Sequence, residues 1–472
     1  MHSPMSSPPD VQQPFPLRNA EFVCLMAAFQ ALQALAIDIM LPALGTISQD
    51  LELADPNRRQ LIVGVFLVCA GLGSLVPGSL ADRFGRRPVL VFALCAYVLF
   101  ALICALVPSF TVLLVARGLM GFFSAPLMVL PMTVVRDRFE GDQMARTQSL
   151  VSMTFMVIPM IAPMLGQGVL LVASWRWIFG ITAALAVAVL AWTLARLPET
   201  LHEEHRQPIN SLVIARNMAR ALTVRESFGY VMGVALIQAA MFGYINSAQQ
   251  LVGEHFGAGL MFPAVFGGMA LVMASTNFVN SRIVERFGAR RVSQTALLAY
   301  TLAAAIHLLV AAAGGETLWT FVVLMTFSMC MMSFIGANFQ AISLQPFART
   351  AGSAASVISF VRLLLGSTLG VVIGQAYDGS SRPIFAAMLV AGIATFFAVL
   401  YSERGRLFRR LNYPPAYHAA GARPDKAVRP LSGTASSAEE LDEAHDDGDH
   451  QQQVDQRTAH LEDQEAEQPE HK

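Results

Sequence analysis

Twelve apolar runs, each about twenty residues long and separated by polar turns, are the feature that most constrains this chain. A helix needs roughly 20 apolar residues to cross about 30 Å of hydrocarbon. No water in that layer can pair with the backbone, so runs of this length indicate helices. The runs lie near 22–43, 60–80, 89–107, 110–132, 147–171, 177–196, 228–251, 260–281, 293–313, 318–342, 352–376 and 383–402. The sequence therefore predicts an all-α membrane protein with twelve transmembrane helices.

The charge balance supports a membrane protein. Charged residues make up 14% of the chain, against roughly 25% in soluble domains. Residues 439–472 carry 13 acids and 2 bases, which leaves 20 acids and 30 bases for the rest of the chain. A basic body with an acidic tail fits a protein whose cytoplasmic turns carry the positive charge.

The one long polar connection divides the runs into six plus six. It covers residues 197–227, and we expect a surface helix near 211–222 within it. The expected parts are a disordered N-terminus (1–20), a six-helix bundle (21–196), this central loop (197–227), a second six-helix bundle (228–402) and a disordered acidic tail (403–472). We see no cleavable signal peptide, so the first helix is expected to be an uncleaved signal-anchor.

Arginine placement predicts the orientation. Arginines gather in alternate turns, and the opposite turns hold only Arg58, Arg59, Arg176 and Arg382. With an even number of spans, this bias predicts that both termini lie in the cytoplasm.

The turn after the second run combines glycines, an acid and arginines. Gly85 permits a positive φ and Pro88 can begin the next helix. A similar basic turn, 285–291, follows the eighth run, so the two halves look like a duplication with a substrate cavity between them near the middle of the membrane. We expect the first turn to gate the cytoplasmic side through Gly78, Asp82, Arg83, Gly85, Arg86 and Arg87.

Three charged residues lie inside apolar runs, where a charge is costly and hence a functional candidate: Asp38, Arg117 and Arg362. A carboxyl in a medium of low dielectric holds its proton more tightly, so Asp38 could exchange a proton near neutral pH. Its alternative role is that of a hydrated structural acid. Arg117 could tune the proton site or act as a hydrogen-bonding hub. Arg362 could reach Asp38, bind an anionic group of a substrate, or extend to the membrane surface.

Other polar residues are candidates for gating and binding. Two prolines four residues apart bend the fifth span, which makes Pro159, Pro163 and Gly166 a candidate hinge. Glu21, at the start of the first span, fits a helix-dipole role better than a transport role. Amides beside aromatic rings suit a broad binding site, although they could equally bond neighbouring helices. The candidate cavity residues are Gln30, Gln33, Tyr244, Asn246, Gln249, Gln250 and Arg362.

Several functional classes find no support. The chain has no phosphate-binding glycine loop with a lysine, no His/Glu zinc motif and no nucleophile elbow. We therefore expect no enzyme activity, no cofactor, no metal and no nucleic acid, and a gradient of protons as the energy source. The five cysteines all lie inside apolar runs without metal-ligand spacing. We expect a monomer in the lipid bilayer.

The turn from Gly78 to Leu90 resembles the hallmark loop of the major facilitator superfamily. More narrowly, residues 20–402 resemble the twelve-span drug:proton antiporters of the Bcr/CflA multidrug efflux group. Asp38-Ile-Met-Leu-Pro42 looks like that group's first-span signature, and Arg117 with Gly121 looks like the family's fourth-span motif. Trp175-Arg-Trp-Ile-Phe179 and Leu197-Pro-Glu-Thr-Leu201 also look like this family.

The resemblance implies the major facilitator fold and proton-coupled efflux across the bacterial inner membrane. It implies a proton on Asp38, a coupling role for Arg117, and a loop acid, Asp82, that holds the second and eleventh spans together in the outward-facing state. The chain departs from the group at Ala162 and Gln167, at Ser247-Ala248, and at Arg362. An additional arginine in the cavity would favour anionic or zwitterionic solutes.

The main hypothesis is thus a proton-driven exporter of drugs or other small amphipathic molecules. The alternative is a metabolite transporter of the same fold with narrow specificity. A third class, a membrane receptor that does not transport, would leave Asp38 without a function and would require a folded tail.

Overall fold

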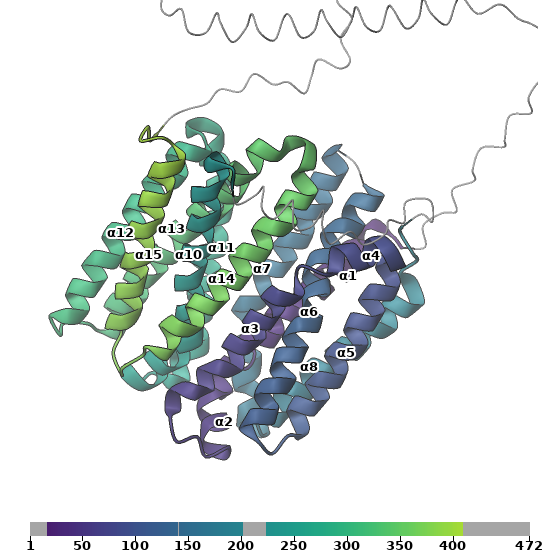
Figure 1. Ribbon diagram of the computed structural model, residues 1–472. Coiled ribbons are helices and arrows are strands. Elements are labelled where there is room, and N and C mark those ends of the chain that lie inside the picture. Colours follow the sequence, from purple (N-terminus) through teal and green to yellow (C-terminus); the bar gives the residue numbers. More distant parts are fainter. Residues whose placement is uncertain (1–16, 140, 202–222, 409–472) are drawn as a thin grey trace, which may run out of the picture. The chain divides into compact units, whose positions relative to one another are not determined.

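A computed structural model describes residues 17–139, 141–201 and 223–408, and the regular structure in these ranges is helical (Figure 1). The first half contains α1 (Asn19–Asp38), α2 (Leu44–Asp50), α3 (Leu61–Gly73), α4 (Pro77–Phe84), α5 (Arg86–Leu106), α6 (Phe110–Arg138), α7 (Gly141–Val172) and α8 (Arg176–Arg196). The second half contains α10 (Arg225–Gln249), α11 (Phe262–Phe287), α12 (Ala289–Ala312), α13 (Leu318–Leu344), α14 (Ala351–Gln375) and α15 (Arg382–Ser402). Short turns of helix, η1 (Leu41–Ala43), η2 (Pro56–Gln60), η4 (Gln250–His255), η5 (Gly259–Met261) and η6 (Gln345–Thr350), join some of them.

The predicted spans are confirmed, with one difference in shape. Within the described ranges, eleven helices are long and apolar enough to cross a membrane, and the pair α3 and α4 makes a twelfth. That pair is bent by 48° at the break before Pro77, a residue that has no N–H to continue the helix. The Ser74 hydroxyl donates to the carbonyl of Gly71 (2.7 Å) and so satisfies one backbone acceptor at the break.

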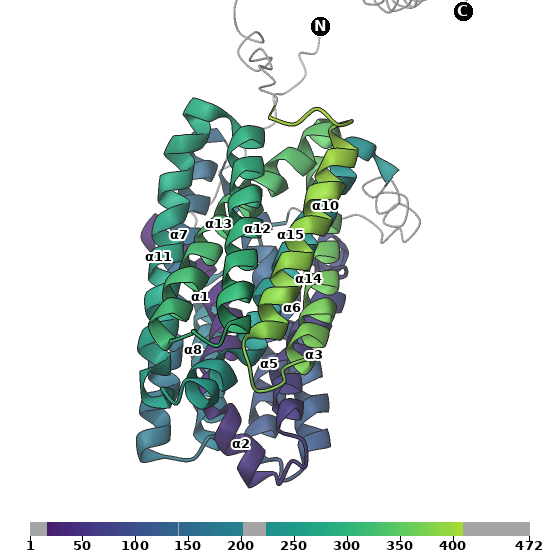
Figure 2. The same ribbon diagram turned by 90° about the vertical axis from the view of Figure 1, so that its left-hand side faces the viewer.

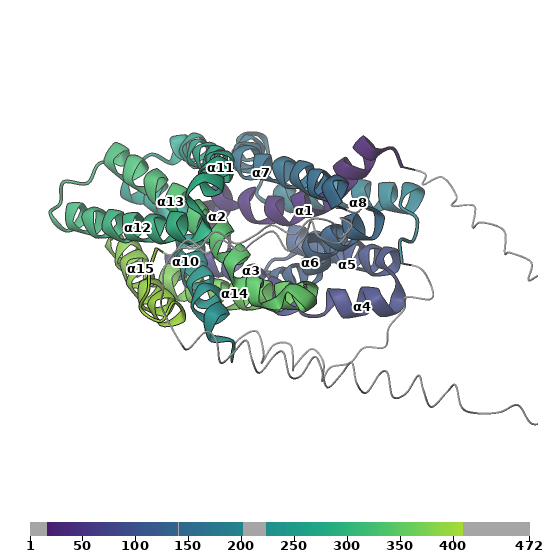
Figure 3. The ribbon, with the colours of Figure 1, turned by 90° about the horizontal axis from the view of Figure 1, so that it is seen from above.

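Each half is held together by long helix pairs. In the first half, α5 packs on α6 and α8, α3 packs on α6, and α1 packs on α7. In the second half, α10 packs on α14 and α15, as Figure 2 shows, and α12 packs on α13. The halves meet along two helix pairs, α3 with α14 and α7 with α11 (Figure 3).

The outer surface of these helices is apolar. Leu106 is 81% exposed, Val172 is 87% exposed and Phe278 is 67% exposed, while Asp38 and Arg117 are buried. A soluble protein rarely exposes so much contiguous apolar area, whereas hydrocarbon is the matching solvent for it. The molecule is therefore a multi-pass membrane protein with its charged span residues turned inward.

Some expectations cannot be compared with the structure. The predicted surface helix near 211–222 and most of both predicted disordered termini lie outside the described residues. The described helices begin at Asn19 and resume at Arg225, and the proposed domain limits stay predictions.

The contact between α6 and α3 offers a test of the packing. A Cβ at Gly121 would overlap the carbonyl group of Phe66, and a rigid backbone cannot move aside cheaply. We expect Gly121→Ala to lower the stability of the purified protein by roughly 1–3 kcal/mol, as overpacked cores do. The measurement is the midpoint of thermal unfolding in detergent, monitored by tryptophan fluorescence.

Gly168→Ala is the matched control, because Gly168 is also helical but has nothing within 4 Å of its Cβ position. Equal midpoints for the two variants would contradict the packing described here.

Candidate functional site

Asp38 is the last residue of α1, and the chain breaks there for a local reason. Pro42 lies four residues later, has no N–H, and would clash with the carbonyl of Asp38 if the helix continued. The side chain is only 5% exposed. Within the described part of the chain, no hydrogen bond or ion pair reaches the Asp38 carboxyl group. A buried acid without a partner is free to bind a proton or a cationic group.

Arg117, on α6, is fully buried and ties three other helices together. Its Nη2 donates to the carbonyl of Ala36 on α1 (3.1 Å), and its Nε donates to the carbonyl of Ile62 on α3 (3.1 Å). The guanidinium also lies over the rings of Phe66 (4.3 Å) and Phe179 (5.8 Å). The acceptors of the Arg117 guanidinium are thus two backbone carbonyls and the sulfur of Met120 (3.6 Å). Because Ala36 is in the last turn of α1, Arg117 holds the helix end on which Asp38 lies.

The proline-containing helix α7 also packs on the end of α1. It is continuous through Pro159 and Pro163. A Cβ at Gly166 would overlap the carbonyl of Ile39 and would lie 3.1 Å from Cγ of Pro42, so only glycine lets α7 come this close. The hinge role remains a prediction, but Gly166 does lie beside the turn that follows Asp38.

The two glutamines of α1 lie in different surroundings. Gln33 is buried and its Nε2 donates to Oγ of Ser124 on α6 (3.4 Å), whose hydroxyl donates in turn to Gly121 (2.7 Å). Gln30, one turn earlier, is half-buried. Gln33 is thus bonded to a neighbouring helix.

The polar residues at the end of α10 divide into two groups. Tyr244 is buried against Phe266 and Phe321. Asn246 donates to the carbonyl of Gly370 (3.3 Å), while its Oδ1 is buried without a partner in the described part of the chain. Gln249 has a similarly unsatisfied Oε1. These two amide oxygens are acceptors that a substrate or water could satisfy.

Gln250 belongs instead to a polar cluster that joins the two halves. It accepts a hydrogen bond from Gln60, and its own Nε2 donates to Asn57 (2.9 Å). Asn57 also donates to the carbonyl of Tyr377 (2.7 Å) and accepts from Gln375 through its own carbonyl (2.7 Å).

Arg59 and Glu254 complete this cluster with an ion pair between the halves (2.5 Å). We call the set Asn57, Arg59, Gln60, Gln250, Glu254 and Gln375 the inter-half lock. It lies at the end of the bundle opposite the Gly85 turn, beside α2 (Figure 1). Sequence reasoning used Arg59 only for orientation and did not consider Glu254, because nothing in the sequence pairs residues 195 positions apart.

Arg362, on α14, is half-buried. It has no hydrogen bond and no ion pair with any described residue, so the suggested contact with Asp38 is not formed in this conformation. Its charge is therefore available to a ligand or to water.

The Gly85 turn is held within its own half. Gly85 has φ +100°, and it begins α5 directly after α4. Arg86 donates to Asp82 (2.5 Å) and to Asp137 (3.0 Å). Among the described residues, Asp82 makes no bond to α14. The expected gate contact between the second and eleventh spans is therefore not present in this conformation.

An acid that sequence reasoning did not single out caps the turn. Glu199, after α8, accepts the backbone N–H groups of Arg86 (2.8 Å) and Arg87 (3.1 Å) at the start of α5. A carboxylate at a helix N-terminus is stabilised by the free N–H groups there. Glu199 belongs to the segment Leu197-Pro-Glu-Thr-Leu201, which follows the last span of this half and was noted above only for its resemblance to the family.

The other residues of the turn face outward. Gly78 has open space around its Cβ position, and Arg83 is exposed, with its guanidinium over the ring of Phe84 (5.1 Å).

The second half contains an equivalent basic turn between α11 and α12. Gly288 has φ +84°, and Arg290 donates to Glu403 directly after α15 (2.8 Å). Glu403 also accepts from the hydroxyl of Tyr230 (2.5 Å). In both halves, therefore, a basic turn is bonded to an acid that follows the last span of the same half.

Comparison with known proteins agrees with this architecture. The family model described as Major Facilitator Superfamily matches residues 26–371. An uncharacterized MFS-type transporter, YdgK, of Bacillus subtilis is 28% identical over 388 residues, which cover 81% of this chain and 96% of that protein. A bicyclomycin resistance protein homolog of Haemophilus influenzae is 25% identical over 390 residues, covering 82% and 98%.

Among solved structures, the human organic anion transporter MFSD10 (TETRAN) superposes with a TM-score of 0.61 at 17% identity, and the match covers 83% of this chain and all of that one. At this identity the likeness concerns the fold alone. The family match and the helical architecture lead to one conclusion: the chain belongs to the major facilitator superfamily and is a membrane transporter of small molecules, not an enzyme.

Proposed function

We propose that the protein is a proton-coupled exporter of drugs or other small amphipathic molecules, working as a monomer in the bacterial inner membrane with both termini in the cytoplasm. The observation that carries this proposal is Asp38, a buried acid at the broken end of α1 that has no bonded partner in the described ranges. The resistance protein homolog among the relatives supports efflux as the direction.

In this mechanism the Asp38 carboxyl group binds either a proton or the substrate. A charged carboxylate in such a site is costly, so it is neutralised by a proton or by a cationic group of the substrate, and each displaces the other. Arg117 does not pair with Asp38. It keeps the end of α1 in place through Ala36, so the acid stays at a fixed position while its charge changes.

The segment after Asp38 connects the proton site to the inter-half lock. A Cβ at Gly45 would lie 3.4 Å from Nε2 of Gln249 and 3.6 Å from Nη1 of Arg59. Movement of this segment when Asp38 changes charge would therefore disturb the lock. With the lock closed, substrate reaches the site from the side of the Gly85 turn, and opening the lock releases it on the other side.

A second candidate function is transport of a narrow class of anionic metabolites. Arg362 favours it, because this half-buried cation has no bonded partner among the described residues and could bind a carboxylate or phosphate group.

Replacing Asp38 tests the exporter directly. We expect Asp38→Asn to abolish substrate-induced proton release from energised inverted vesicles, because the amide cannot carry a proton at this position. The measurement uses a dye that reports acidity and a panel of unrelated antibiotics and dyes. Glu52→Gln is the matched control, since it makes the same chemical change at an exposed acid.

Proton release that survives in Asp38→Asn would rule out this acid as the carrier. A wild-type protein that is folded and silent across the whole panel would favour the anionic-metabolite transporter, and Arg362→Gln would then be the first variant to test.

The lock makes a separate prediction. We expect Arg59→Glu to open the lock, because it places two acids opposite each other, and to raise labelling of a cysteine at Gln375 by a polar maleimide several-fold. The double variant Arg59→Glu with Glu254→Arg restores the pair and should return labelling towards the wild-type level. Equal labelling in all three proteins would mean that this ion pair does not hold the halves together.

A further inference from the structure

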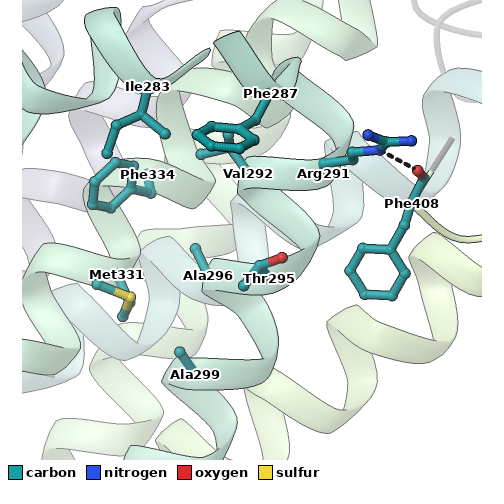
Figure 4. A pocket seen from close by; sticks show the side chains of 10 residues that line it. All are labelled: Ile283, Phe287, Arg291, Val292, Thr295, Ala296, Ala299, Met331, Phe334 and Phe408. Atoms are coloured by element: carbon teal, nitrogen blue, oxygen red, sulfur yellow. Dashed lines mark hydrogen bonds between the residues drawn. The ribbon is translucent and has the colours of Figure 1, made fainter. Parts of the chain in front are cut away.

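A groove in the second half lies apart from the proposed transport site. It is formed by α11, α12 and α13 together with Phe408, and its volume is about 420 Å³, within the roughly 300–1,000 Å³ of small-molecule sites (Figure 4). It lies at the end of the bundle where α11 turns into α12 at Gly288.

The lining of the groove is polar at one end and apolar along its length. Arg291 lies in the first turn of α12, at one end of the lining beside Phe408 (Figure 4). Val292, Ala296 and Ala299 follow along one face of the same helix, and Phe334 of α13 lies opposite (Figure 4). The groove therefore matches a molecule with a negative head and a long apolar tail.

The charge of Arg291 is held in place but not neutralised. Its Nε donates to the carbonyl of Phe408 (2.8 Å), as the dashed line in Figure 4 marks. No acid forms an ion pair with it in the described part of the chain. The adjacent Arg290 is different, because it is bonded to Glu403 and Gln345. Of these two neighbouring arginines, only Arg291 has no ion pair with a described residue, so its charge is available to a ligand.

The surface around the groove is apolar and exposed. Phe278, Phe287 and Leu298 are 67%, 48% and 45% exposed on the adjoining surfaces of α11 and α12. A phospholipid is the amphiphile that a membrane places against such a surface, and basic pockets between transmembrane helices suit anionic head groups. A cationic amphiphile would instead meet the charge of Arg291.

We propose that this groove is a binding site for an anionic phospholipid, with an acyl chain against Ala296, Ala299 and Phe334 and the head-group phosphate on Arg291. The phosphate accepts charge-assisted hydrogen bonds from the Nη atoms that the bond to Phe408 leaves free. The site is independent of the proposed proton and drug coupling, because its lining includes neither Asp38 nor Arg117 nor any residue of the inter-half lock.

The test is a lipid titration of the full-length protein in detergent, read by native mass spectrometry. The probes are dioleoyl phosphatidylglycerol, dioleoyl phosphatidylcholine with the same chains, and glycerol 3-phosphate without chains. We expect phosphatidylglycerol to bind more tightly than phosphatidylcholine. Arg291→Gln should weaken phosphatidylglycerol binding by about fivefold, the effect of one interfacial cation. It should weaken phosphatidylcholine binding less, because choline offsets the charge of the phosphate that both lipids carry. Ala299→Trp, which fills the groove, should weaken binding of both lipids.

Arg136→Gln is the matched control, since Arg136 is another exposed arginine near a helix end but is remote from the groove in sequence and fold. A loss in this variant equal to that in Arg291→Gln would overturn the proposal, as would displacement of the lipid by glycerol 3-phosphate. Phosphatidylglycerol binding that is unchanged in Arg291→Gln would also overturn it, and would leave the groove to another apolar occupant such as the segment after Phe408. Arg291 is exposed, so this variant keeps the test decisive even if Ala299→Trp fails to fold.

Discussion

The buried guanidinium of Arg117 is the interaction on which the first half depends. A cation inside a membrane-spanning bundle is costly unless every donor finds a partner and the charge finds a polarisable surface. Here two backbone carbonyls and the Met120 sulfur accept from the three nitrogens, and two aromatic rings lie against the guanidinium. One of these carbonyls, that of Ala36, is among the last four of α1. The last four carbonyls of a helix have no N–H donor within the helix. The arginine and the broken helix end therefore satisfy each other, and Asp38 is left without a bonded partner among the residues that the structure describes.

The duplicated turns explain how each half can move as one body. Each turn begins a helix after a glycine of positive φ, and each is bonded to an acid that follows the last span of its own half. These bonds stay within a half, so rocking one half against the other need not break them. The inter-half lock is different, because its hydrogen bonds and its ion pair cross between the halves at the far end of the bundle. A conformational change that opens this end would have to break these bonds.

Much of this arrangement could be predicted from the sequence, and the exceptions have a common cause. Apolar run length predicted the spans. The bend between α3 and α4 was not predicted, although Pro77, which cannot continue a helix, lies at it. Arg117 of the fourth run and Asp38 of the first run were identified as functional candidates because placing a charge in hydrocarbon costs free energy. Gln250 was expected in the cavity, yet it lies in the lock, since an amide on an apolar helix does not indicate which neighbour it will meet. Glu199, Asp137, Glu254 and the role of Arg59 were missed because their partners lie 51 to 195 positions away.

The sequence by itself determined the class of molecule. The lengths of its apolar runs, the placement of its arginines and the repeated turn left a duplicated membrane bundle as the consistent solution, because hydrocarbon penalises unpaired backbone and unpaired charge everywhere along a span. Only the tertiary structure decided which polar groups neutralise one another. It bonded Arg117 to carbonyls instead of to Asp38 and closed the bundle with Arg59 and Glu254. It also placed Arg291 beside an apolar groove without an ion pair to any residue that the structure describes. Such choices depend on distances between helices far apart in the chain, and local pattern contains no information about them.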